Sequence, residues 1–230
     1  MNDLYAESWR LYKHHTENFA DDLEYYRTFC KNRDSLELFA GYGRITNHLA
    51  EAGVNIETIE LSNEFSSLIK IQEHKKHVGD VTKVVLPKKF ERIFAAYNSF
   101  CLLTTDSQLQ SFFKNLSDML SQNGLISLSY YHPDFWEEAV SSKFKYEEHI
   151  VSYEPTFDLS GRAEKKAVWK DVYVINSRKI LHEYPVRIFE SHEDLLPFLK
   201  PNNLRIVSVV ENFNNPEISE PGWIDYLISF

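Results

Sequence analysis

The segment from Leu36 to Ser62, LELFAGYGRITNHLAEAGVNIETIELS, restricts the fold of this chain more than any other. An apolar run meets a turn that contains Gly41 and Gly43, an amphipathic segment follows, and a second apolar run ends in Glu60. Glycines at a strand-to-helix turn allow the backbone to approach a ligand closely at the carboxyl edge of a sheet. The first turn of the following helix presents unpaired N–H groups at the same place. The segment therefore predicts a β-α-β unit whose first turn binds a ligand.

The alternation of strands and helices continues beyond this unit. The short apolar runs SLELF, IETIEL, RIFAAY and LISLSYY alternate with segments of helical spacing at 44–51, 63–74 and 106–120. Strands this apolar are typically buried on both faces, and helices between them imply right-handed crossovers. We therefore expect an α/β fold with a doubly wound, mainly parallel, Rossmann-like sheet. Because no repeat or low-complexity linker divides the 230 residues, residues 1–230 are expected to form one domain.

Two segments do not follow this alternation. Residues 3–29 have helical spacing, with Tyr5, Trp9 and Tyr12 on one stripe. The segment 146–190 is rich in aromatic and β-branched residues and has turn signals at DLSG and NSRK. This composition predicts antiparallel strands, so the segment is expected to be an antiparallel β insertion that lies over the carboxyl edge of the main sheet, above the active site.

Composition excludes several classes of function. The net charge is −9, which argues against a nucleic-acid or anionic-membrane surface, because phosphate binding needs clustered Lys and Arg. Cys30 and Cys101 are the only cysteines, and no His/Cys/Asp grouping has metal-ligand spacing, so neither a disulfide framework nor a metal site is expected. The polar N-terminus and the lack of a long apolar run predict a cytoplasmic protein.

The residues around the glycine turn distinguish two ligand classes. In a dinucleotide fingerprint, the third glycine allows close packing of helix on strand, but Thr46 stands at that position here. Glu37 lies four residues before the first glycine, where its carboxylate would repel a pyrophosphate. A ligand that carries a positive charge fits this turn better.

On these residues the chain resembles the class I S-adenosylmethionine-dependent methyltransferases. The first motif of that family is an acidic residue, a spacer and a G-x-G-x-G run, which Glu37, Gly41 and Gly43 match. Phe39 occupies the usual first-glycine position, and Ala40 follows it. The resemblance covers the chain from about residue 20 onward, and it implies an antiparallel last strand.

The resemblance also implies how S-adenosylmethionine is bound. Glu60, at the end of the second strand, is implied to bind both ribose hydroxyls, with Leu61 against the adenine. In the segment VGDVTKV, Asp80 and Val81 are implied to contact the adenine edge. Asn98, in FERIFAAYNSFCLL, is implied to lie beside the methionine portion.

The expected activity is methyl transfer to N or O of a small metabolite. A protein or peptide methyltransferase, and a cofactor-binding protein that has lost catalysis and serves as an interaction partner, remain alternatives. An antiparallel insertion at 146–190 favours a roofed pocket for a small-molecule acceptor over an open groove. In such a pocket the side chains of Tyr153, Phe157, Trp169 and Tyr173 are candidates for the lining. Whether the protein is a monomer or a homodimer stays open.

Two residues are the candidates for catalysis. His132 follows the fifth strand in SYYHPDF, where strand ends line the site in open α/β sheets. Tyr12 or Tyr5 is expected to close over the acceptor from an N-terminal helical lid, residues 1–30. His14 and His15 are expected on a solvated helix face, and His149 falls within the insertion.

Overall fold

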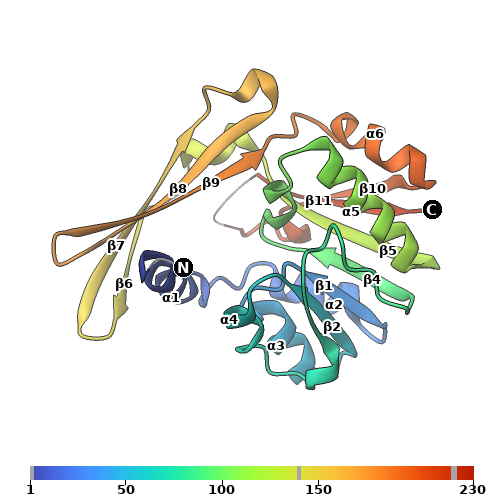
Figure 1. Ribbon diagram of the computed structural model, residues 1–230, viewed down its shortest axis with the longest axis horizontal. Helices are drawn as coiled ribbons and strands as arrows, with labels where there is room; N and C mark the ends of the chain where they lie inside the picture. The colour runs from blue at the N-terminus through green and yellow to red at the C-terminus, as the bar shows by residue number, and fades with distance from the viewer. Residues whose placement is uncertain (1–2, 139–140, 219–221) are drawn as a thin grey trace.

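The structure, a computed structural model, describes residues 3–138, 141–218 and 222–230, with side chains from Ser8 onward. A seven-stranded sheet and a four-stranded sheet lie beside each other, with the N-terminal helix α1 next to the smaller one (Figure 1). The helices are α1 (Asp3–Thr16), α2 (Leu23–Cys30), α3 (Arg44–Glu51), α4 (Asn63–Ser66), α5 (Asp106–Met119) and α6 (Leu196–Leu199).

The seven-stranded sheet has the order β10-β11-β5-β4-β1-β2-β3. Its first five strands in the chain pair in parallel, whereas β11 pairs antiparallel with both β5 and β10. The predicted doubly wound sheet with an antiparallel last strand is therefore confirmed. The strands are β1 (Ser35–Leu38), β2 (Ile56–Glu60), β3 (Lys76–Val78), β4 (Phe90–Ala95), β5 (Leu120–Tyr131), β10 (Arg205–Glu211) and β11 (Trp223–Ser229).

The helix expected over residues 3–29 is two helices, because residues 17–22 turn toward the main sheet. The Arg44 guanidinium donates hydrogen bonds to the Phe19 carbonyl oxygen at 2.9 Å and to the Asp22 carboxylate at 2.6 Å. The Phe19 ring packs against Tyr97 and Trp223. In a continuous helix, the Phe19 carbonyl oxygen would accept a hydrogen bond from a backbone N–H of the helix. Its bond to Arg44 and the packing of the Phe19 ring therefore favour the break.

The helix expected over residues 63–74 is also shorter, because α4 ends at Ser66. The Lys70 N–H donates to the Asn47 side-chain oxygen at 2.6 Å, a bond to α3 that replaces a bond within a helix. Helix α3 itself occupies the predicted residues 44–51, and Thr105 caps α5 through a capping box with Gln108.

The insertion is an antiparallel sheet of four strands, in the order β6-β7-β8-β9. It starts at Ser142, before the expected residue 146, because a short first strand precedes the predicted ones. The strands are β6 (Ser142–Tyr146), β7 (His149–Asp158), β8 (Lys166–Ile175) and β9 (Arg178–Arg187). Asn176 and Ser177 join the last two with positive φ angles of 49° and 64°, as a two-residue hairpin turn requires.

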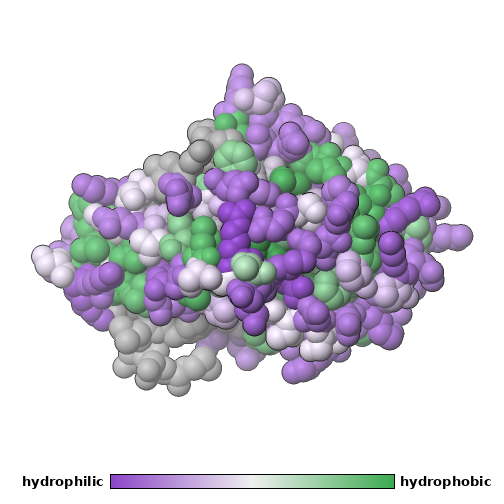
Figure 2. All heavy atoms as spheres, turned by 90° about the horizontal axis from the view of Figure 1, so that it is seen from above, coloured by the Kyte–Doolittle hydropathy of each residue, from purple (hydrophilic) through white to green (hydrophobic). Residues whose placement is uncertain are grey.

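Helix α1 connects the two sheets. Leu11 is fully buried against Val151, Tyr153, Tyr173 and Ile180 of the insertion. On the face shown in Figure 2, hydrophobic residues appear in patches between hydrophilic ones. The main core combines residues of the large sheet with residues of α5 and α6. None of the described helices is long and apolar enough to cross a membrane.

The buried ion pair between Arg44 and Asp22 gives a stability prediction. Their side chains are 11% and 1% exposed, so Asp22→Ala leaves a buried guanidinium without its charge partner. We expect the free energy of unfolding to fall by about 3 kcal/mol in urea titrations. The matched control is Glu24→Ala, which breaks the exposed pair with Arg27 and should cost less than about 0.5 kcal/mol. Equal effects of the two substitutions would contradict this account.

Candidate active site

The glycine turn lies at the carboxyl end of β1, as predicted. Phe39, Gly41 and Gly43 have φ angles of 54°, 56° and 81°, all in the left-handed region. A Cβ atom on Gly41 would meet nothing within 4 Å, so the turn leaves space above this residue. Phe39 adopts the left-handed conformation at the usual first-glycine position, at a cost of about 1 kcal/mol. The turn thus keeps its shape without the first glycine.

Glu60 lies beside this turn because β2 pairs in parallel with β1. One carboxylate oxygen accepts a hydrogen bond from Gly41 N at 2.7 Å, and the other accepts one from Ser62 N at 2.8 Å. The Leu61 backbone N–H also forms a hydrogen bond with this carboxylate, so only part of its acceptor capacity is left for the hydroxyl groups of a ligand. Next to it, Leu61 is 70% exposed, which leaves an apolar side chain free to contact a flat ring.

Asp80, Val81 and Asn98 form the other strand ends of this edge. Asp80 accepts hydrogen bonds from the backbone N–H and the hydroxyl of Thr82, which fixes its loop. Val81 is buried. The Asn98 side-chain oxygen accepts a hydrogen bond from Tyr131 N at 3.3 Å and so ties the end of β4 to the end of β5.

A small cavity of about 40 Å³ lies between this edge and α1. It has room for a few water molecules, so a nucleoside requires side chains or α1 to move. The lining brings together predicted residues that are far apart in the sequence, namely Tyr12, Glu37, Phe39, Ala40 and Gly41. A larger groove of about 450 Å³, lined by Asn47, Glu51, Val54, Lys70 and Lys75 among others, lies at the amino end of β2 and contains none of the predicted site residues.

Glu37 is buried below the turn, with a side chain that is 4% exposed. Burial raises the pKa of its carboxyl group to about 8, although Thr46 donates a hydrogen bond to it. At neutral pH the carboxyl group therefore carries a proton, and a cation in the cavity would favour the charged form. The preference of the turn for a positively charged ligand stays a prediction.

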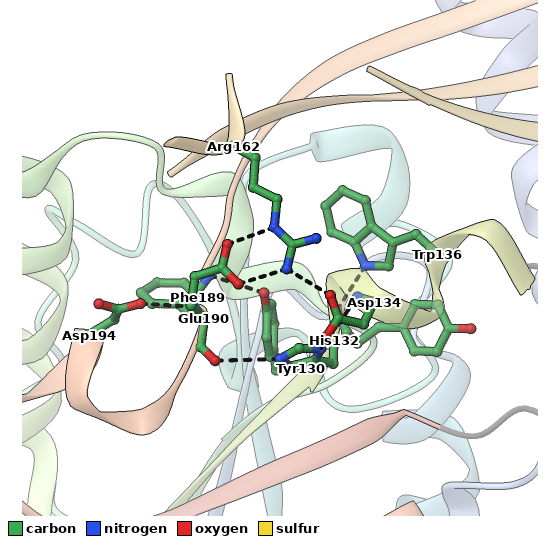
Figure 3. A network of polar contacts seen from close by, with 9 residues as sticks. Tyr130, His132, Asp134, Trp136, Arg162, Phe189, Glu190 and Asp194 are labelled. Carbon is green, nitrogen blue, oxygen red and sulfur yellow. Dashed lines mark hydrogen bonds and ion pairs between the residues drawn. The ribbon is translucent and has the colours of Figure 1, made fainter. Parts of the chain in front are cut away.

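His132 lies at the end of β5 in a polar network at the base of the insertion (Figure 3). Its Nε2 atom is 3.4 Å from the Glu190 carbonyl oxygen, and its Nδ1 atom is 3.3 Å from Asp134 N. Arg162 bridges the Asp134 and Glu190 carboxylates. The residues that line the cavity beside the glycine turn do not include His132. Its catalytic role stays a prediction.

The other histidines differ in part from expectation. The prediction that His15 lies on a solvated helix face is wrong, because its ring packs against Tyr153. The centroids of the two rings are 3.7 Å apart. Burial lowers the pKa of His15 to about 4, so it is neutral at physiological pH. His14 is partly exposed and pairs with Glu17, while His149 contacts Asn176 at the far hairpin. The side chain of Tyr5 lies outside the described residues.

Several residues at this site escaped the sequence analysis. Arg44, Tyr42 and Tyr97 line the cavity, and Arg44 holds the α1–α2 connection through Asp22. Outside the cavity lining, Asp171 on β8 is a further buried carboxyl group, on the face of the insertion that carries Tyr153 and Tyr173. Little in the sequence signalled its burial, because β8 also contains the charged residues Lys166 and Lys170.

Among the described residues, no group of three or more His, Cys, Asp or Glu side chains is placed to hold a metal ion.

The structure is similar to those of several methyltransferases. An S-adenosylmethionine-dependent methyltransferase from Clostridium acetobutylicum aligns with 18% identity and a TM-score of 0.74 over 98% of both chains. The sugar N-methyltransferase KedS8 from Streptoalloteichus aligns with 16% identity and a TM-score of 0.74, over 94% of this chain and 90% of its own. CalS10, an amino pentose methyltransferase from Micromonospora echinaspora, aligns with 14% identity and a TM-score of 0.70, over 99% and 97%.

The chain matches no family model and no curated protein. The similar structures nevertheless cover between 94% and 99% of the chain. The protein therefore has the fold of S-adenosylmethionine-dependent methyltransferases.

The Glu37 carboxyl group predicts an unusual pH dependence of stability. Its pKa is raised from 4.5 to about 8 on folding, so the native state binds more protons between these values. The free energy of unfolding should therefore fall as the pH rises from 5 to 8, by on the order of 4 kcal/mol from this group. Glu37→Gln should remove this part of the slope in denaturant titrations, while Asp225, with its pKa raised to about 7, retains its own. An unchanged slope in the variant would contradict the assignment.

Proposed function

We propose that this protein is a methyltransferase that uses S-adenosylmethionine and acts on a small molecule. The observation that carries the proposal is the position of the Glu60 carboxylate against the Gly41 N–H at the carboxyl edge of the sheet. In the proposed complex, the acid at the end of the second strand contacts the ribose of the ligand. The glycine turn after the first strand contacts the methionine portion of the same ligand. The fold shared with known methyltransferases supports this use of the edge.

In this proposal the predicted residues hold the cofactor along the edge. Glu60 accepts hydrogen bonds from the ribose hydroxyls, and the exposed Leu61 lies against the adenine, with Asp80 and Val81 at the adenine edge. Glu37 and Asn98 lie near the methionine portion, whose positive charge suits the Glu37 carboxylate. When bound, the cofactor supplies a methyl group that is already activated on a sulfonium.

In this proposal the protein mainly aligns the two reactants and excludes water, and its side chains take little direct part in the chemical step. Two reactants held in line gain several kcal/mol from proximity alone. Tyr12 lines the cavity from α1, and Leu11 of the same helix packs on the insertion. A site covered in this way favours a small acceptor over a protein or peptide, which would need an open groove. Tyr12 in the lid is therefore proposed to contact the acceptor.

Cofactor binding is the first test. We expect micromolar binding of S-adenosylmethionine and of S-adenosylhomocysteine in calorimetric titrations. Glu60→Ala removes the acceptors of two hydroxyl groups and should weaken binding by about 2–3 kcal/mol. The control is Glu51→Ala, an exposed acid on α3, which should leave affinity unchanged. A folded wild-type protein that gives no heat with either ligand would refute the proposal, and preferential binding of NAD would favour a dinucleotide site.

His132 is proposed to serve the acceptor, and its replacement distinguishes two roles. Its 3.4 Å contact with the Glu190 carbonyl oxygen is long, so an acceptor group can displace it. If the acceptor is a hydroxyl, it needs a base, and His132→Ala should lower turnover by about 10²–10⁴-fold with cofactor affinity unchanged. If it is an amine, the loss should be smaller and fall partly on acceptor affinity. Wild-type turnover in the variant would remove His132 from the site.

A further inference from the structure

The cavity beside the glycine turn is lined by an acid that forms no ion pair with the residues that the structure describes. This acid is Glu37, whose side chain is 4% exposed. Its hydrogen bonds come from the hydroxyl group and the backbone N–H of Thr46. Both donors are neutral. A carboxylate at this place would lose its water without gaining a counter-charge, and this loss disfavours the charged form.

A neighbouring ion pair offers Glu37 little compensation. Arg44 also lines the cavity, and its positive charge favours the Glu37 carboxylate. Its guanidinium, however, donates two hydrogen bonds of 2.6 Å to the Asp22 carboxylate. The negative charge of Asp22 acts on Glu37 in the opposite direction. The counter-charge that Glu37 lacks can therefore still be supplied by a cationic ligand in the cavity.

Helix α1 covers the cavity and limits the water that reaches Glu37. The Tyr42 side chain, from the glycine turn, is in edge contact with the Tyr12 ring at 6.4 Å between centroids. The Thr16 hydroxyl group donates to the Tyr12 carbonyl oxygen at 2.9 Å, so its oxygen accepts the hydrogen bond of 3.0 Å from the Tyr42 hydroxyl group. The remaining cavity of about 40 Å³ holds only a few water molecules. Glu37 is therefore poorly solvated on its cavity side.

Glu37 is the group of this lining that titrates near neutral pH. Burial raises the pKa of its carboxyl group to about 8. The other groups that face it or the cavity are the Cys30 thiol and the phenols of Tyr12, Tyr42 and Tyr97. Burial raises the pKa of Cys30 to about 12, and it raises the pKa values of Tyr12 and Tyr42 above their ordinary value of 10. A proton released between pH 6 and 8 therefore comes from a carboxyl group.

We propose that binding of the cofactor displaces the proton of Glu37. The positive charge of the methionine portion enters the cavity and replaces this proton as the counter-charge of the carboxylate. The O–H bond of the carboxyl group breaks, its electron pair stays on oxygen, and the proton leaves to the solvent. This inference rests on the proposed methyltransferase function and describes how the same site selects a charged cofactor.

The coupling makes cofactor affinity depend on pH. The free protein holds the proton up to a pH of about 8, whereas the complex has lost it. Release of one proton raises the affinity by up to about tenfold per pH unit in this range, and the affinity levels off above it. A ligand that has the adenosine part but no positive charge gains nothing from the same rise in pH. The free protein thus avoids a buried negative charge, which appears only when its partner is bound.

Calorimetric titrations at pH 7 in two buffers of different ionisation enthalpy, PIPES and Tris, count the protons released. S-adenosylmethionine carries a sulfonium and an ammonium group, S-adenosylhomocysteine keeps only the ammonium group, and 5′-methylthioadenosine has neither. The third ligand is needed because burial also raises the pKa of Glu60, which is proposed to contact the ribose of all three. We expect release of close to one proton with S-adenosylmethionine and almost none with 5′-methylthioadenosine. Release with S-adenosylhomocysteine as well would assign the effect to the ammonium group, and its absence would assign it to the sulfonium.

Substitutions connect the released proton to Glu37. Glu37→Gln keeps an oxygen for Thr46 but cannot ionise, so it should release no proton, and its affinity for S-adenosylhomocysteine should not rise between pH 6 and 8. The wild-type affinity should rise at least tenfold over the same range. The matched control is Glu51→Gln, an exposed acid on α3, which should release as many protons as the wild type. A second variant, Thr46→Val, removes a hydrogen bond that favours the carboxylate and should move the rise in affinity to higher pH.

Three results would overturn the inference and leave the proposed function intact. The first is a heat of cofactor binding that does not depend on the buffer, and the second is equal proton release with 5′-methylthioadenosine. The third is a Glu37→Gln variant that releases as many protons as the wild type. A folded wild type that gives no heat with either S-adenosylmethionine or S-adenosylhomocysteine would instead refute the proposed function itself.

Discussion

The parallel pairing of β1 with both β2 and β4 is the constraint on which the site depends. It brings three strand ends to one edge, so that the turn after β1 meets Glu60 from β2 and Asn98 from the end of β4. The hydrogen bond from Gly41 N to Glu60 closes this arrangement. The other N–H groups of the turn are used by the backbone, because Ala40 N donates to the Ile59 carbonyl oxygen and Gly43 N donates to that of Ala40.

Residues outside the main sheet complete the site from the other side. Arg44, the first residue after the glycine turn, holds the α1–α2 connection through the Phe19 carbonyl oxygen and the Asp22 carboxylate. The residue that follows the glycine turn thus also positions α1, the helix that covers the cavity beside this turn. Helix α1 in turn packs on the insertion through Leu11 and His15. Movement of α1 would therefore change both the cover of the cavity beside the glycine turn and the packing of the insertion.

The sequence predicted the parts of the fold that local patterns determine. The apolar runs and the glycine turn were enough for the parallel sheet and for α3, whose predicted limits match the structure. The breaks after Thr16 and Ser66 were missed, because bonds to distant partners, Arg44 and Asn47, cause them. Such partners leave no signal in the spacing of nearby residues.

In the candidate site, too, some residues could be predicted from local patterns and others could not. Glu37, Gly41 and Glu60 could be predicted because they lie at strand ends with recognisable spacing. The burial of Asp171 could not be predicted, because an acid within a strand is usually exposed to solvent. Its contact with Tyr153 depends on the pairing of β7 with β8. His15 was misplaced for the same reason, because the packing of α1 on the insertion joins segments that are far apart in the sequence.

A crystal structure of the protein with S-adenosylhomocysteine tests the central claim most directly. The account predicts that both ribose hydroxyls lie within hydrogen-bond distance of the Glu60 carboxylate, with the adenine against Leu61 and the homocysteine portion above Gly41. Ligand bound instead in the groove at the amino end of β2, beside Asn47 and Lys75, would contradict it.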